Sequence, residues 1–538
     1  MKIKQSKEFK KKKYEAKGKN KRRGLHDGED DYQDDDMLAR DMLFNQTQPL
    51  PGQLANCELC EKRFTVTAYS KTGPDGGLLC TKCSKEMKAE EKKQQPKQQP
   101  KQRGKRRQIE SARMMGDVKP GAKSLVDICV RAVADNIVDI EEFGLLPQSL
   151  LDRLSKVLSR RRVINSRTLE LFLQPDSDKI SIYDAASLQT DDFEKIFSHM
   201  PELEQVDLRN AGQLKDSVVY YLLDHNPHIT HLTFEASNLI SNAAWTQFFI
   251  KLGPSLQSFK TSWLDNAMDD TVIETLARQC SNLKRLNMKV LWLPTEASLN
   301  SISTLTNLEH LSLSFNKDAC PEVLNNLITS TGANLRTLSL ETYQNADDTT
   351  LAAIHSTCTQ LSKLRLTENT ICTDAGFAEL FTHWPNRPLS IIDFHDMRSC
   401  DANNPDGPSE PVGLASAGFA AMIAHSGRSL TNLNIKSCRH ISRDALLSAF
   451  DAAEIRCPVL KELDMSFCHG VTDEVVYAIF KSCPKLEKLV IFGCNLSSVV
   501  GVPVGLAVIG LIGEAVVVEG GFEKRGREDK ERGLGLWP

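Results

Sequence analysis

Hydrophobic residues recur in one fixed pattern through the second half of the chain. From Leu203 onward the motif L-x-x-L-x-L, with substitutions at some positions, returns eleven times. Successive copies begin 25 to 30 residues apart, apart from one step of 41 residues. The copies begin at Leu203, Ile229, Leu256, Leu283, Leu308, Leu335, Leu361, Leu389, Leu430, Leu460 and Leu486.

A repeat of this length predicts one small structural unit per copy. The fourth and sixth residues of a copy lie on the same side of a short strand, because side chains alternate along a strand. The residues that follow, for example 471–486, have the apolar spacing of a helix. Stacked units of this kind form a leucine-rich-repeat solenoid, an α/β fold with a parallel sheet on its concave side. We expect about eleven repeats within residues 176–498, and a rim loop at residues 401–411, which contain Pro and Gly.

Several copies carry cysteines around the leucine run, such as Cys457 before it and Cys468 at its end. A buried cysteine behaves as a small apolar residue with a weak donor, so these thiols are interpreted as structural and not catalytic. This subtype resembles the leucine-rich repeats of F-box proteins, which present substrates to ubiquitin ligases. The cysteines interpreted in this way are Cys280, Cys438, Cys457, Cys468, Cys483 and Cys494.

A helix with one narrow apolar stripe is predicted just before the array. Leu125, Cys129 and Val133 recur every four residues. Two interpretations stay open: the helix caps the open end of the solenoid, or the stripe is the face that a partner binds. Residues 134–173 are expected to continue as an uninterrupted helical module. Its leucine stripes are Leu145, Leu146, Leu150, Leu151, Leu154 and Leu158.

Two C-x-x-C pairs stand 19 residues apart near the N-terminus. This spacing suits a structural zinc site, because Zn²⁺ takes four thiolates in a tetrahedron. A redox C-x-x-C would need a thioredoxin-like fold and would explain only one pair. Phe64 and Val66 supply a miniature core, and residues 73–77 (GPDGG) a hairpin turn. The predicted ligands are Cys57, Cys60, Cys80 and Cys83.

Charge is unevenly distributed, although the net charge is only -3. Twelve Lys and Arg lie within the first 23 residues, an acidic block follows at 27–36, and a second basic run occupies 101–107. Such runs act as nuclear-import signals, or they only solubilise the chain and hold nucleic acid loosely. Whether the zinc module contacts DNA or protein is left open. The candidate DNA-contacting residues are Lys62, Arg63, Lys82, Lys85, Arg103, Lys105, Arg106 and Arg107.

The third, fifth and seventh residues of each copy are expected to face the concave surface. Eight of them are basic and six are acidic. A surface with nearly equal numbers of basic and acidic residues attracts a polyphosphate only weakly, and it suits a protein partner better. The basic residues are Arg209, Lys260, Arg285, Lys289, Lys363, Arg365, Lys436 and Lys488; the acidic ones are Asp207, Glu235, Glu341, Asp393, Glu462 and Asp464.

Several classes of protein are disfavoured. The N-terminus lacks the apolar stretch of a secretory signal, and the most apolar run, residues 499–513, is too short to cross a bilayer, so no membrane partner is expected. Fifteen scattered cysteines fit a reducing compartment. No phosphate-binding loop, zinc-protease helix or nucleophile elbow occurs, so we expect neither an enzyme nor a small-molecule substrate. His395 and His425 are interpreted as solvated surface side chains.

Two resemblances sharpen these expectations. Residues 124–133 (SLVDICVRAV) resemble the BC-box, the helix that binds elongin C, and the segment after it resembles the F-box-like part of elongin A. In that family the small cysteine lets the helix lie close in the pocket of elongin C, which would be the role of Cys129. The order of segments along the chain resembles the fungal leucine-rich-repeat subunit of the global-genome nucleotide excision repair complex, the "Rad seven" family.

That resemblance implies a nuclear, non-catalytic subunit that associates with damaged DNA. It also implies partnership with a Snf-type ATPase carrying a RING finger, and with elongin C and a cullin in a ubiquitin ligase. The alternative is an F-box-like leucine-rich-repeat substrate receptor of a ubiquitin ligase unrelated to DNA repair. The expected segments are a basic and acidic tail (1–50), a zinc finger (51–90), a basic linker (91–122), BC-box/F-box-like helices (123–175), the repeats (176–498), and a C-terminal cap and tail (499–538).

Overall fold

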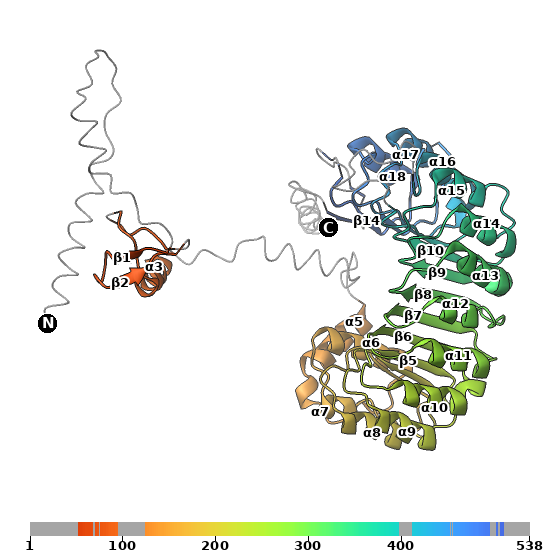
Figure 1. Cartoon of the computed structure of the whole chain (residues 1–538), viewed down its shortest axis with the longest axis horizontal. Helices are drawn as coiled ribbons and strands as arrows, with labels where there is room; N and C mark the ends of the chain where they lie inside the picture. Colours follow the sequence, from red (N-terminus) through yellow and green to blue (C-terminus); the bar gives the residue numbers. More distant parts are fainter. Residues whose placement is uncertain are drawn as a thin grey trace, which may run out of the picture. The chain divides into compact units, whose positions relative to one another are not determined.

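The computed structural model contains two compact units, Met1–Lys105 and Arg106–Pro538 (Figure 1). It describes residues 52–94 except 68, 69 and 75, and residues 124–510 except 398–411, 452, 455, 495, 497–501, 504 and 505. The predicted tail, most of the basic linker, the rim loop at 401–411 and the C-terminal tail beyond residue 510 therefore lie outside the described residues.

The first unit contains a small hairpin and one helix. Strands β1 (Leu54–Asn56) and β2 (Arg63–Thr65) pair antiparallel, with Ala55 opposite Phe64. The GPDGG segment forms the predicted turn, since the Gly73 N–H donates to the Gly77 carbonyl at 2.6 Å and Thr72 pairs with Leu78. Helix α3 (Thr81–Gln94) follows directly.

The second unit begins with helices, but these are interrupted, so the expectation of a continuous helical module is wrong. Helix α5 (Leu125–Asp135) is followed by a 3₁₀ turn (Ile137–Asp139), α6 (Gln148–Arg160) and α7 (Ser166–Glu170). An irregular loop joins the turn to α6, because Gly144 takes a left-handed φ of 56° and Pro147 fixes the backbone before α6 begins. Helix α6 packs on the first strand of the array, and α5 packs on α6.

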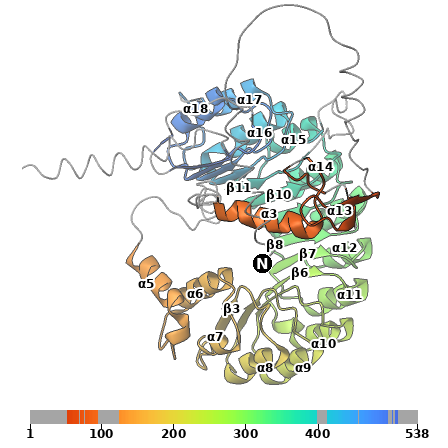
Figure 2. The same cartoon turned by 90° about the vertical axis from the view of Figure 1, so that its left-hand side faces the viewer.

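The rest of the second unit is a leucine-rich-repeat solenoid with a 13-stranded parallel sheet. The strands follow one another in chain order, and Figures 1 and 2 show the helices along the outer side of the curve. The eleven predicted copies coincide with β4 to β14, and the array extends by one strand at each end. The strands are β3 (Lys179–Ile182), β4 (Gln205–Leu208), β5 (His231–Glu235), β6 (Ser258–Leu264), β7 (Arg285–Leu291), β8 (His310–Phe315), β9 (Thr337–Glu341), β10 (Lys363–Thr367), β11 (Ile391–Asp393), β12 (Asn432–Asn434), β13 (Glu462–Asp464), β14 (Lys488–Val490) and β15 (Ala507–Ile509).

The sequence pattern did not predict the two extra strands, β3 and β15. Strand β3 (KISI) has isoleucines where the later copies have leucines. Strand β15 pairs with β14 from within the segment that is expected to be the C-terminal cap and tail.

The helices of the array are α8 (Thr190–His199), α9 (Asp216–His225), α10 (Asn242–Leu252), α11 (Asp270–Gln279), α12 (Glu296–Ile302), α13 (Pro321–Thr331), α14 (Asp348–Thr357), α15 (Asp374–Phe381), α16 (Ser416–Ser426), α17 (Arg443–Ala449) and α18 (Asp473–Ser482).

One continuous core runs along the array. The fourth and sixth residues of the copies form rows across the sheet; Leu338, for example, lies opposite Leu364, and both are fully buried. The first acidic residue of a helix often binds the start of the next helix: the Asp348 carboxylate accepts from the backbone N–H and the hydroxyl of Thr373, at 2.8 and 2.7 Å. Each repeat therefore caps its neighbour as well as packing on it.

The eighth residue of the copies shares an unusual backbone conformation. Its φ lies between 55° and 70° in every copy but the one that begins at Leu308. The left-handed turn takes the chain out of the strand toward the outer side, and it strains ordinary L residues. The residues concerned are Asn210, Ala236, Trp263, Val290, Thr342, Glu368, Asp396, Ser437, Phe467 and Gly493.

Candidate functional site

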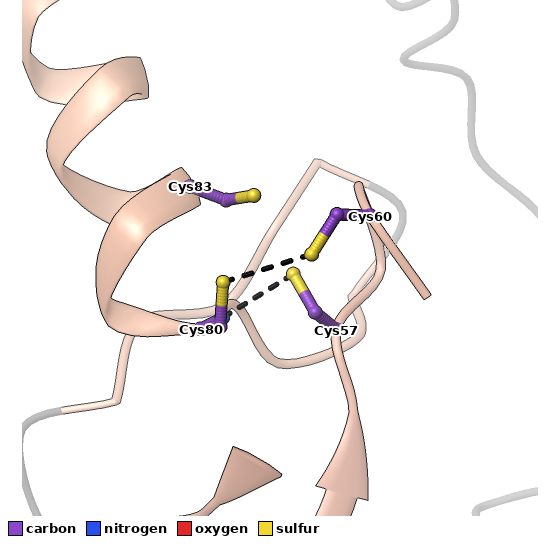
Figure 3. Close-up of side chains that lie close together, drawn as sticks. All are labelled: Cys57, Cys60, Cys80 and Cys83. Atoms are coloured by element: carbon purple, nitrogen blue, oxygen red, sulfur yellow. Dashed lines mark hydrogen bonds between the residues drawn. The ribbon is translucent and has the colours of Figure 1, made fainter. Parts of the chain in front are cut away.

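The four predicted ligands converge at one point of the first unit (Figure 3). Cys57 follows β1, and the knuckle turns back at Glu61, whose N–H donates to the Cys57 carbonyl at 2.8 Å and whose φ is 58°. Cys80 precedes α3 and Cys83 lies in its first turn. All four sulfur atoms lie within 4.8 Å of one another, and those of Cys60 and Cys80 are 3.7 Å apart.

These distances fit one tetrahedral metal ion. With Zn–S bonds of about 2.3 Å, the sulfurs of a tetrahedral site are about 3.8 Å apart. Burial raises the pKa of the Cys57 thiol, but hydrogen bonds from the backbone of Cys80, Cys60 and Leu59 outweigh it and lower that pKa to about 6. Burial raises the pKa of Cys83.

The unit has little core besides this cluster. Cys57, Leu79 and Cys83 are buried together, with Phe64 and Met87 packed against them. Val66 is also buried. A core this small, within the described residues, contributes little to the stability of the unit.

The basic residues predicted to contact DNA fall into two groups. Lys62, Arg63, Lys82 and Lys85 lie in the first unit, and all four are exposed. Lys62 and Arg63 flank the knuckle, whereas Lys82 and Lys85 belong to α3. Arg103, Lys105, Arg106 and Arg107 lie outside the described residues.

Helix α5 is attached to the rest of the second unit by one face. Val130 and Ala134 are buried in the core that continues into the array. The Ser124 hydroxyl caps the helix by accepting from the Asp127 N–H at 3.1 Å, and the Asp127 carboxylate pairs with Arg153 of α6. These contacts attach α5 by one face, so its opposite face is not needed to hold the helix in place.

The predicted stripe of α5 divides between these two faces. Leu125 is 76% exposed and Cys129 is exposed, whereas Val133 is half-buried against the core. The buried face is the one that the cap interpretation requires, and the exposed face is the one that the partner-binding interpretation requires; α6 packs directly on β3.

The exposed apolar surface is wider than the sequence pattern predicted. Val126 and Ile128 of α5 are 42% and 51% exposed. Val138 and Leu145, in the irregular segment after α5, are also exposed, and Leu145 is fully so. Helical periodicity places Leu145 in an apolar stripe. Because the backbone around Gly144 forms an irregular loop and not a helix, the Leu145 side chain is exposed instead. A run of uncovered apolar residues of this kind is typical of a protein-binding surface.

Ion pairs cross the inner face of the sheet in its C-terminal half. Glu341 pairs with Lys289 and, at 2.8 Å, with Arg365. Arg365 also pairs with Asp393 at 2.7 Å, and the His395 ring lies 2.7 Å from the same carboxylate. We call these five residues the charge ladder.

The charge ladder corrects the interpretation of His395 as a solvated side chain. The hydrogen bond to Asp393 raises the His395 pKa above its ordinary value. Burial raises the pKa of Asp393, but His395 and Arg365 outweigh burial and lower it. His425 is not solvated either, since its ring stacks on Trp384 and contacts the Asn386 carbonyl at 3.1 Å.

No helix in the described part of the chain has both the length and the apolar character needed to cross a membrane. Of the apolar run at 499–513, residues 499–501, 504, 505 and 511–513 lie outside the described residues.

Comparison with known proteins relates the chain to fungal DNA repair proteins. The family described as the DNA repair protein rhp7 treble clef domain matches residues 51–89. The DNA repair protein rhp7 of Schizosaccharomyces pombe is 28% identical over 452 residues, which cover 82% of this chain and 76% of that protein. The DNA repair protein RAD7 of Saccharomyces cerevisiae is 24% identical over 407 residues, which cover 69% of this chain and 67% of that protein.

A solved structure supports the fold. In the crystal structure of a Rad7 and Elc1 complex in yeast, the matching chain superposes with a TM-score of 0.58 at 22% identity, over 73% of this chain and 99% of that one. The chain thus combines a four-cysteine treble clef with a leucine-rich-repeat solenoid, and it is homologous to the fungal DNA repair proteins rhp7 and RAD7.

Proposed function

We propose that this chain is a non-catalytic subunit of a nucleotide excision repair complex and an adaptor of an elongin–cullin ubiquitin ligase. The repair role is supported by its homology to two proteins named for DNA repair, and by the match of residues 51–89 to the rhp7 treble clef domain. The adaptor role is supported chiefly by one observation, the exposed apolar face of α5. Nuclear localisation follows from the proposed repair role.

The shape of α5 suits a partner with an apolar pocket. Leu125 projects farthest into solvent, and one turn along the helix Cys129 presents only a small sulfur. A bulky side chain at residue 129 would hold a partner away from the helix, so a cysteine allows close approach. Burying Leu125 in a pocket would stabilise the complex by about 1.5–3 kcal/mol.

The identity of this partner is proposed from the relative. The yeast Rad7 chain was crystallised with Elc1, an elongin C. Residues 124–133 have the Leu and Cys spacing of an elongin-C-binding helix, and the structure leaves that helix face uncovered within the described residues. We therefore assign elongin C to α5, with Val126 and Ile128 beside the main contacts Leu125 and Cys129.

Binding of recombinant elongin C to the full-length chain tests this assignment. Leu125→Ala combined with Cys129→Lys should weaken binding at least about 100-fold, because the change removes an anchor and introduces a long cation into an apolar contact. The control is Ile250→Lys, which places a lysine on a 48% exposed apolar residue of α10. Wild-type affinity in the double variant would mean that α5 is only a cap.

The other parts of the proposal have separate supports. The four-cysteine cluster would hold a structural zinc ion, since four thiolates leave no open position for catalysis. A Snf-type ATPase and a cullin are proposed from the family resemblance. The alternative, a substrate receptor unrelated to repair, does not account for the homology to rhp7 and RAD7 or for the rhp7-type treble clef domain.

A further inference from the structure

The charges of the inner face are not evenly mixed, although their numbers nearly balance. In the C-terminal half, Glu341 and Asp393 are paired within the charge ladder. At β4, Arg209 pairs with Asp207 at 2.9 Å. The third and fifth residues of the copies on β5 to β8 form a different set, whereas the seventh residues Glu235 and Lys289 belong to ion pairs with Arg209 and Glu341.

Two rows of inner-face residues cross β5 to β8. The register of the strands aligns His231 with Ser258, Arg285 and His310 in one row, and Thr233 with Lys260, Asn287 and Ser312 in the next. Their neighbours along each strand, such as Phe259 and Leu286, are fully buried on the opposite side of the sheet. We call these eight residues the basic block; it contains two permanent cations, two imidazoles, four uncharged polar groups and no carboxylate.

The two cations of the basic block are not neutralised by ion pairs. Within the described part of the chain, neither the Lys260 ammonium nor the Arg285 guanidinium lies within 4.0 Å of a carboxylate oxygen. Burial and then the nearby Arg285 lower the pKa of Lys260. Burial also lowers the pKa of His231 and His310, with Arg285 adding to the effect. The positive charges of Lys260 and Arg285 thus lack an ion-pair partner, and a bound anion would stabilise them.

We propose that the basic block binds an extended segment of a partner protein that is rich in Asp and Glu. Three strand spacings of about 4.8 Å make the block about 14 Å wide, which matches roughly four residues of an extended peptide. Lys260 and Arg285 stand in different rows on neighbouring strands, among hydroxyl, amide and imidazole groups that can bind further carboxylates. Several single carboxylates fit this arrangement better than one phosphate dianion does.

The surroundings favour a short acidic peptide over DNA. Glu235 lies at the edge of the block, Asp207 one strand before it and Glu341 one strand after it. A DNA strand carries a phosphate at every nucleotide, so a longer polyanion would run onto these carboxylates. A peptide can end its acidic run at the boundary.

Exposed tryptophans on the same repeats also suit a protein partner. Trp263, near the end of β6, is 60% exposed, and Trp292, directly after β7, is 50% exposed. Tryptophan and arginine are the residues that most often anchor protein interfaces. An apolar side chain of the partner, next to its acidic run, would pack against one of these two rings.

The test is fluorescence anisotropy of the full-length chain with a labelled peptide that alternates Glu and Ser over about ten residues. Lys260→Gln with Arg285→Gln should weaken binding at least about tenfold, because charge-assisted contacts are lost. The control, Lys251→Gln with Arg278→Gln, removes the same charge from α10 and α11 on the outer side and should leave affinity unchanged. Elongin C binding, measured in parallel, should be unaffected, so this inference and the elongin assignment fail independently.

Three outcomes would overturn the inference. They are equal binding of the peptide by wild type and the inner-face variant, equal binding of a Gln-for-Glu peptide, and tighter binding of an oligonucleotide through the same two residues. The last result would make the block a nucleic-acid site. Lys260→Gln alone provides the same comparison if the double variant does not fold.

Discussion

Cys468 donates its thiol to the backbone carbonyl of Ile435, 3.1 Å away in the preceding repeat. Cys438 makes the equivalent bond to Phe394 at 3.1 Å, and Cys494 to Met465 at 3.3 Å. The cysteines thus link neighbouring repeats, as their structural interpretation requires. Burial raises the pKa of Cys494 to about 11 and that of Cys468 further, so neither thiol is a nucleophile near neutral pH.

Removing one of these links should destabilise the array. Cys468→Ala should lower the free energy of unfolding by about 1–2 kcal/mol, because it removes a buried hydrogen bond and leaves a small cavity. Urea denaturation followed by circular dichroism measures the change. Cys129→Ala, at an exposed thiol outside the array core, is the control and should change stability by less than about 0.5 kcal/mol. If Cys468→Ala left the free energy of unfolding unchanged, the hydrogen bond of the thiol would contribute nothing to stability.

The charge ladder should make stability depend on pH in two directions. Glu341 and Asp393 have lowered pKa values in the fold, so their contribution is present above their unfolded pKa values and is lost as pH falls through the folded ones. His395 has a raised pKa, so its contribution is present below about 6.5 and is lost as pH rises through the folded value. The ladder should therefore stabilise the array most between about pH 4.5 and 6.5.

Asp393→Asn tests this dependence, because it removes the carboxylate that both Arg365 and His395 contact. The free energy of unfolding should fall by about 2–3 kcal/mol near pH 6, and the difference from wild type should shrink toward pH 3 and above pH 8. Asp224→Asn, at an exposed ion pair on α9, is the control and should have little effect at any pH. A difference that is constant across this range would contradict the account.

The treble clef should depend on its metal. The full-length chain should contain about one zinc ion, and Cys60→Ser should lose it, because three thiolates and a hydroxyl bind zinc poorly. Elemental analysis measures zinc content, and hydrogen exchange should show faster exchange in residues 52–87 only. Cys129→Ser should retain the metal. Slow exchange of the Leu79 amide in chelator would refute a metal-dependent fold.

DNA affinity should belong to the first unit and its basic flanks. Lys82→Gln with Lys85→Gln should weaken binding to any sequence and lower the slope of log K against log salt by up to about 1.8, since each phosphate contact contributes about 0.9. Filter binding over a range of salt concentrations measures both. The control is Lys251→Gln with Arg278→Gln on the array. If the control, and not the α3 variant, lowers affinity, the solenoid itself contacts DNA.

Sequence periodicity predicted the repeats well because Leu338 and its equivalents must be buried in every unit. The spacing of the two C-x-x-C pairs also predicted correctly that the four cysteines lie together, because a structural zinc site takes four thiolates. The left-handed eighth residue could not be predicted: Trp263, Val290 and Thr342 avoid this conformation, and stacking of the repeats imposes it. The exposure of Leu145 could not be predicted either, because it depends on the loop at Gly144. The basic block could be recognised only from the strand register, which aligns residues of four repeats.

The most direct test of the central claim is purification of the tagged full-length protein from cells that express it, with quantitative mass spectrometry of its partners. Wild type should carry both elongin C and a Snf-type ATPase. Leu125→Ala with Cys129→Lys should lose elongin C and keep the ATPase, whereas the Ile250→Lys control should keep both. Retention of elongin C by the double variant, or absence of the ATPase from wild type, would contradict the account of a repair subunit that recruits a ubiquitin ligase through α5.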